Sequence, residues 1–287
     1  MLADLLPKML AMLAAAATAV AFERLTERRG LMPPAFSQGA RRLAAVTLLA
    51  GLLYVMVWSP LLHPGEAAET GPGEERSPFA LFLGHGLFAG MLLAWHGLGY
   101  QRPAGPGATF KELRRQLGLV SLRPAEDFAL GIAGGFGGWL LLPVVALLVA
   151  FFLELSGAGS ELPQEIPQVT LWIAGLPVLI RIAVGLSAGL VEEAFFRGFL
   201  QPRLGILAST FLFVAGHASY QPLLQLVGLT VFSLLLALLT AWRQSIVPSV
   251  VAHAFFDLWQ LLVVVPLGAR FLPSGPALAH QLLRGIC

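Results

Sequence analysis

Cysteine and charged residues are both scarce in this chain of 287 residues. The only cysteine is Cys287, which excludes an intrachain disulfide and a metal cluster built on cysteines. Charged residues make up 12% of the chain, whereas soluble domains typically contain about 25%. The small net charge of +2 gives no indication of nucleic-acid binding. Hydrophobic residues instead reach 57%, which predicts a protein whose solvent is the lipid bilayer.

Apolar runs long enough to cross a membrane recur along the whole sequence. A transmembrane helix needs roughly 20 apolar residues to cross the hydrocarbon core. We predict eight spans, at about residues 5–22, 43–62, 79–100, 128–153, 169–195, 206–220, 222–242 and 245–266. The fold class predicted from them is an all-α polytopic membrane protein. We divide it into an N-terminal part, residues 1–124, and a C-terminal helical core, residues 125–287.

Lysine and arginine are concentrated in alternate loops, after the first, third, fifth and seventh predicted spans. They are Arg24, Arg28, Arg29, Arg41 and Arg42, then Arg102, Lys111, Arg114, Arg115 and Arg123, and finally Arg197, Arg203 and Arg243. Acidic residues fill two of the other loops: Glu66, Glu69, Glu74 and Glu75, then Glu154, Glu161 and Glu165. The positive-inside rule places the basic loops in the cytoplasm and both termini outside it.

Two shorter segments affect this topology. Residues 5–22 fit either a retained span or a signal peptide. Cleavage would leave the arginine-rich residues 24–42 outside the cytoplasm, so we favour a retained span. Residues 110–117 alternate apolar and basic side chains at helical spacing, which predicts a short amphipathic helix on the cytoplasmic membrane surface.

A cluster of charges interrupts the apolar sequence at Glu192, Glu193 and Arg197. A charge at membrane depth costs roughly 2.5–3.5 kcal/mol on insertion scales, so such a cluster indicates function. Neighbouring residues on a helix differ by roughly 100°, so the two glutamates face different directions. Arg197 lies one turn after Glu193, and we predict that these two form a structural ion pair. Glu192 is then left to face the helix bundle as a general base or acid.

Three more polar residues, His217, His253 and Asp257, fall in later apolar runs. Counted at 1.5 Å per residue from the cytoplasmic ends of their spans, they and Glu192 lie roughly 12–18 Å deep. The matched depth predicts one polar site inside the bundle. Asp257 lies one turn after His253 and is placed to orient its ring, and Phe213 is placed one turn before His217 to wall the site.

Other polar residues of the spans are interpreted as structural. A single histidine in a membrane helix commonly forms a hydrogen bond to a neighbouring helix, which is our interpretation of His85 and His96. We expect Arg181 to reach the interface or pair locally, and Asp127 to mark the interfacial start of the fourth span.

The patterns Glu192-Glu193-x-x-x-Arg197, Phe213-x-x-x-His217 and His253-x-x-x-Asp257 resemble the three-motif signature of the CPBP family. This is the CAAX protease and bacteriocin-processing family, also called Abi, which includes the type II CAAX prenyl endopeptidases. The resemblance covers roughly residues 125–266. It implies eight transmembrane helices around a polar cavity that opens to the cytosolic side.

By the same resemblance, Glu192 activates a hydrolytic water together with His217. His253 and Asp257 would hold the tetrahedral oxyanion or position the scissile carbonyl. Many members of the family have asparagine where this chain has Asp257. Because an aspartate donates a hydrogen bond only when it is protonated, we assign Asp257 the role of orienting His253.

We therefore predict an intramembrane endopeptidase that needs no cofactor and cleaves a membrane-associated protein or peptide. The chain has no His-Glu-x-x-His, no Gly-x-Ser-x-Gly and no paired-aspartate motif, which disfavours other intramembrane protease classes. One alternative is a zinc enzyme with Glu192, His217 and His253 as ligands. Another is a membrane scaffold or bacteriocin-immunity factor without proteolytic activity. The Ala-, Leu-, Gly- and Arg-rich composition suggests a bacterial inner membrane, where prenylated substrates are not expected.

Overall fold

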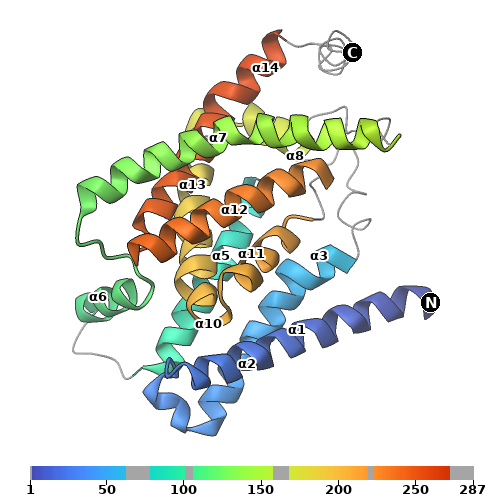
Figure 1. Cartoon of the computed structure of the whole chain (residues 1–287). Coiled ribbons are helices and arrows are strands. Elements are labelled where there is room, and N and C mark those ends of the chain that lie inside the picture. The colour runs from blue at the N-terminus through green and yellow to red at the C-terminus, as the bar shows by residue number, and fades with distance from the viewer. Residues whose placement is uncertain (1, 63–77, 101–105, 158–167, 219–222, 272–287) are drawn as a thin grey trace.

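The computed structural model describes residues 2–62, 78–100, 106–157, 168–218 and 223–271, and every regular element in these ranges is helical (Figure 1). Within the described residues, five helices are long and apolar enough to cross a membrane: Leu5–Arg28, Gly39–Leu62, Pro124–Leu155, Gln225–Arg243 and Val247–Gly268. The predicted all-α membrane fold is confirmed.

The N-terminal part consists of α1 (Leu2–Arg28), the 3-10 turn η1 (Pro34–Ser37), α2 (Gly39–Leu53), the π-helical η2 (Tyr54–Trp58), α3 (Ser59–Leu62), α5 (Pro78–Gly99) and α6 (Pro106–Gln116). The C-terminal part begins with α7 (Pro124–Leu155), α8 (Gln168–Gly175) and α9 (Val178–Ser187). The π-helical η4 (Ala188–Glu192) and η5 (Ala194–Leu200), α10 (Gln201–Leu204) and α11 (Ile206–Ala215) follow. The described chain ends with α12 (Leu223–Arg243), α13 (Val247–Trp259), the π-helical η6 (Gln260–Val264) and α14 (Val265–Phe271).

Two predicted spans differ from the helices that the structure contains. The fifth, residues 169–195, is not one continuous helix, because proline lacks a backbone N–H and α9 starts only after Pro177. Beyond Ser187 the same stretch becomes π-helical. The sixth, residues 206–220, is helical only as far as Ala215, so His217 lies in the turn that follows α11 and not inside a helix.

Closely spaced glycines let α7 pack directly on α13 (Figure 1). A Cβ at Gly135 would lie 2.5 Å from the carbonyl oxygen of Ala252, and one at Gly131 would lie 2.5 Å from Val251 Cβ. Small residues four apart allow two membrane helices to approach backbone to backbone. This contact fixes the position of α13, the helix that carries His253.

Aromatic side chains from both parts of the chain hold η5 in place. Phe199 lies 4.9 Å from Phe22 of α1 and 5.1 Å from Trp95 of α5, measured between ring centres. Phe195 stacks on Phe88 at 4.6 Å. All five rings are buried, so the segment that follows the two glutamates is anchored against α1 and α5.

The basic loops meet at one end of the molecule. An Arg29 Nη1 donates to the Pro202 carbonyl over 3.0 Å, and the Ile246 N–H donates to the Gly118 carbonyl over 3.0 Å. These contacts join the loops after the first and fifth spans and after the third and seventh. Six acidic residues of the alternate loops lie outside the described residues, as do two others used above: Glu66, Glu69, Glu74, Glu75, Glu161, Glu165, Arg102 and Cys287.

Three polar residues that the sequence analysis interprets as structural form contacts between helices. His96 Nδ1 donates to Gln116 Oε1 over 3.0 Å and so ties α5 to the amphipathic α6. Arg181 Nη1 donates to the carbonyl of Leu261 in η6 over 3.0 Å. Asp127, at the start of α7, is buried and forms an ion pair with Arg243 at the end of α12.

Candidate active site

The two central glutamates lie where the backbone departs from the α-helix. Glu192 is the last residue of η4, and Glu193 stands between η4 and η5. Short π-helical segments inside helices are frequent at functional sites, because the wider turn re-aims the side chains around it. Both glutamates are buried, and their carboxylates contact different partners, as the sequence predicts.

Glu193 and Arg197 lie side by side in the interior. Glu193 Oε1 is 3.2 Å from Arg197 Nη1, and the two side chains are 0% and 1% exposed. Arg197 Nη2 also donates to the hydroxyl of Ser233 in α12 over 2.9 Å. The guanidinium carbon lies 4.4 Å from the centre of the Phe213 ring in α11, a cation–π contact. The arginine therefore joins η5, α11 and α12 around one buried carboxylate.

Glu192 lies between two histidines from opposite sides. Its Oε1 is 3.3 Å from His85 Nε2, and its Oε2 is 3.9 Å from His217 Nε2. Oε2 is buried and has no hydrogen-bond partner within the described part of the chain. The other His217 nitrogen, Nδ1, donates to the Phe213 carbonyl over 2.7 Å. In a neutral ring His217 Nε2 is then a lone-pair acceptor facing Glu192.

His253 lies between two carboxylates. Its Nδ1 is 2.9 Å from Glu193 Oε1, and its Nε2 is 3.6 Å from Asp257 Oδ2. The expected neighbour Asp257 is present, but Glu193 is the nearer partner. Sequence spacing assigned Glu193 to Arg197 alone, because a contact between Glu193 and the distant helix α13 leaves no periodic signal along the chain. The Phe213 ring lies 4.6 Å from the His217 ring and 5.9 Å from the His253 ring, so it does wall the site.

His85 is the site neighbour that the sequence interpretation missed. It was expected to bond a neighbouring helix, and it does, but its partners are Glu192 and Ser187. His85 Nδ1 lies 2.9 Å from Ser187 Oγ. The histidine belongs to none of the three motifs and sits in the N-terminal part of the chain, so only its polarity within an apolar run marked it.

The residues of the zinc alternative do not form a three-ligand centre. His253 Nδ1 is committed to Glu193, and Glu192 approaches His85 and His217 instead. Across the described ranges, no group of three or more His, Cys, Asp or Glu side chains is arranged to hold a metal ion. The described side chains thus show no preformed three-ligand centre, and the metal requirement stays a prediction.

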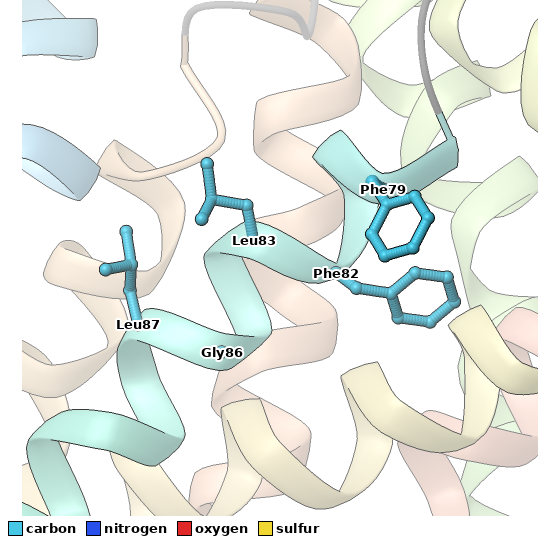
Figure 2. Close-up of a pocket in the computed structure, with 5 residues that line it drawn as sticks. All are labelled: Phe79, Phe82, Leu83, Gly86 and Leu87. Atoms are coloured by element: carbon cyan, nitrogen blue, oxygen red, sulfur yellow. The ribbon is translucent and has the colours of Figure 1, made fainter.

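An apolar pocket of about 410 Å³ lies along α5, and Figure 2 shows the residues that line it. It is lined by Phe79, Phe82, Leu83, Gly86 and Leu87. The Phe82 ring lies 6.4 Å from the His85 ring. One wall of the pocket, Phe82, thus lies next to the histidine that contacts Glu192.

Comparison with known protein families finds a match over the segment that holds the three motifs. Residues 174–259 match the family model of type II CAAX prenyl endopeptidase Rce1-like proteins. The predicted resemblance is confirmed. The matched segment holds all six charged and histidine residues of the three motifs, and the family indicates a membrane protease. No curated protein and no solved structure matches the chain.

Proposed function

We propose that the chain is an intramembrane endopeptidase in which Glu192 and His217 activate a water molecule. The observation that carries this proposal is the buried Oε2 of Glu192, which has no hydrogen-bond partner among the described residues and lies 3.9 Å from His217 Nε2. Hydrogen bonds to oxygen and nitrogen acceptors span about 2.7–3.0 Å. One water molecule can therefore donate a hydrogen to each of these two acceptors, which leaves its lone pairs directed away from them.

Glu192 is the group that takes the proton of this water. As the proton moves to Oε2, the water oxygen attacks the scissile carbonyl carbon and a tetrahedral intermediate forms. Glu192 then returns the proton to the leaving amine nitrogen, and the C–N bond breaks. General base catalysis of this kind contributes typically 10²–10⁴ in rate. His217, anchored through Nδ1 to the Phe213 carbonyl, holds the water on the line of attack.

His253 and Asp257 serve the carbonyl oxygen in this proposal. His253 donates to Glu193 through Nδ1, so it can donate to an oxyanion only when Nε2 also carries a proton. Asp257 orients the ring from 3.6 Å, and its side chain is partly exposed. We propose that the reaction needs no metal ion.

The substrate proposed is a membrane-anchored peptide or protein that reaches the site along α5. The exposed apolar residues Phe79, Leu83 and Leu87 suit the anchor of such a substrate, and the matched family is named for prenylated CAAX peptides. We place the enzyme in a bacterial plasma membrane with its site open to the cytosolic side. Other lipid-anchored or membrane-spanning peptides are therefore tested together with prenylated ones.

The proposal is tested with the purified chain in lipid nanodiscs and an internally quenched farnesylated CAAX peptide. Peptides that accumulate in the membranes of a Glu192→Ala strain, identified by mass spectrometry, supply native candidates for the same assay. We expect Glu192→Gln to lose at least 100-fold in rate, chelators to have no effect, and the surface control Glu112→Gln to keep full activity. Full biological activity of Glu192→Gln would instead support the scaffold or immunity alternative.

A further inference from the structure

We propose that Ser187 and His85 are positioning residues for Glu192. They form a hydrogen-bonded chain, from Ser187 Oγ to His85 Nδ1 over 2.9 Å and from His85 Nε2 to Glu192 Oε1 over 3.3 Å. This hydrogen-bonded chain occupies Oε1 of Glu192 and leaves Oε2 directed at His217. This inference rests on the proposed function in one respect, namely that Glu192 is the base.

The π-helical segment makes this chain possible. Ser187 directly precedes η4 and Glu192 is its last residue, so the two are five positions apart. In an α-helix, residues five apart are rotated by roughly 140° and face different neighbours. A π-helix closes its hydrogen bonds between residues five apart, which brings both side chains onto one face. One imidazole on α5 can therefore contact both of them.

Tight packing keeps η4 in this geometry. A Cβ at Gly189 would lie 2.7 Å from the backbone nitrogen of Ala254 in α13. The backbone of η4 thus lies directly against α13 on one side, while His85 of α5 lies on the other. The orientation of the Glu192 side chain is therefore set by η4 and by the neighbouring helices α5 and α13.

Hydrogen-bond chemistry determines how His85 acts. A carboxylate oxygen only accepts, so His85 Nε2 donates to Glu192. In the neutral ring, Nδ1 then accepts from the Ser187 hydroxyl. The same hydroxyl lies 3.1 Å from the Val184 carbonyl, which gives it a second acceptor when Nδ1 is protonated and donates to Oγ. His85 can therefore donate to Glu192 in both its neutral and its charged form.

The first experiment compares His85→Gln with His85→Leu on the quenched farnesylated peptide. A glutamine amide places a donor close to the position of Nε2, and leucine removes it. We expect His85→Leu to lower kcat by roughly 10- to 100-fold with little change in KM, the range for losing a hydrogen bond to a charged group. His85→Gln should restore most of the rate. Adding Ser187→Ala to His85→Leu should cost little more, since residues that act as a unit are not additive.

A matched control separates positioning from structure. His96 lies on the same helix and bonds Gln116, away from the two glutamates. We expect His96→Leu to lower thermal stability while the folded protein keeps its kcat. If His85→Leu and His85→Gln have equal rates, or if both lose stability alone as His96→Leu does, His85 is structural and the inference is overturned.

A second measurement needs no substrate. Dicyclohexylcarbodiimide enters membranes and modifies protonated carboxyl groups, and mass spectrometry locates the product. Removing the His85 donor disfavours ionised Glu192, so His85→Leu should label faster at Glu192 than wild type, His85→Gln or His96→Leu. Equal labelling of all four overturns the inference even if no peptide is cleaved. If His85→Leu yields no folded protein, Ser187→Ala is expected to show the same change in smaller degree, and wild-type labelling of that variant refutes the proposal.

The two proposals fail in different ways. Wild-type activity in Glu192→Gln removes the proposed function, whatever the labelling shows about His85. An inactive Glu192→Gln together with wild-type kcat and labelling in His85→Leu removes only the positioning role.

Discussion

Arg197 gives the sharpest test of how the site is held together. We predict that Arg197→Met destabilises the protein strongly, because it leaves the carboxylate of Glu193 in a fully buried position. Removing one partner of a buried ion pair typically costs about 3–5 kcal/mol. The cation–π contact with Phe213 adds up to about 2 kcal/mol when desolvated, while the remaining hydrogen bond from His253 offsets part of the loss. We therefore expect a net loss of about 3–5 kcal/mol.

A second substitution on the same pair checks the cause. Glu193→Gln in the Arg197→Met background removes the uncompensated charge and keeps an acceptor for His253 Nδ1. The double variant should therefore regain at least half of the lost stability, because a buried pair replaced by neutral groups is often tolerated. An ordinary contact network would instead lose further stability with each change.

The control is the exposed pair on α6. Arg115 lies 2.9 Å from Glu112 but is 74% exposed, so Arg115→Met should have little effect on stability. Glu192→Gln should also stay within about 1 kcal/mol of wild type, since the glutamine keeps an amide oxygen that can accept from His85. The free energy of unfolding is measured by SDS titration in mixed micelles. If Arg197→Met matches Arg115→Met, or if Glu192→Gln is the less stable variant, the division of roles between the two glutamates is wrong.

Four other outcomes are expected. Asp257→Asn should keep substantial peptidase activity, and Asp257→Leu should lose most of it. Full activity of Asp257→Leu would show that the contact between Asp257 and His253 is only a packing contact. His253→Ala should lower the rate by roughly 10²–10³ or more, as expected for an oxyanion donor, and adding Asp257→Leu should make little difference. Gly135→Leu should disrupt the α7–α13 contact and lower the melting temperature, because a Cβ there would lie 2.5 Å from a carbonyl oxygen. Gly137→Leu should be tolerated in the same thermal-shift assay, because nothing described lies within 4 Å of a Cβ at that position. A reporter fused after Arg115 should be cytoplasmic, and a periplasmic signal there would contradict the proposed topology.

The amphipathic helix offers a pH-dependent test outside the membrane. Hydrogen bonds from Arg115 and Gln116 lower the pKa of Glu112 below its ordinary value. Both partners lie within α6, so these bonds contribute to the stability of that helix. The contribution is present at neutral pH and is lost as the pH falls through the lowered pKa. Proteolysis within α6 should therefore increase only under strongly acidic conditions in wild type. In Glu112→Gln it should be raised at every pH, and a wild-type rate in that variant would show that Glu112 does not stabilise α6.

The amino-acid sequence by itself determined the membrane fold and pointed to most residues of the candidate site. Its apolar runs required helices, because only closed backbone hydrogen bonding is stable in lipid. Charges as costly as those of Glu192, Glu193 and Arg197 are visible against such a background without any structure. Spacing along one helix was sufficient for local pairs, and Glu193 with Arg197 and His253 with Asp257 do lie together.

Contacts between helices were decided only by the tertiary structure. Helical spacing along residues 169–195 assumes one uniform α-helix. The break at Pro177 and the π-helical η4 give the side chains other directions. His85 reaches Glu192 across 107 positions of sequence, and His253 reaches Glu193 across 60. Such partners carry no periodic signal, because they depend on which helix faces are pressed together by glycine contacts and aromatic packing. The sequence supplied the reactive groups, and the packing of α5 and α13 against η4 determined which of them meet.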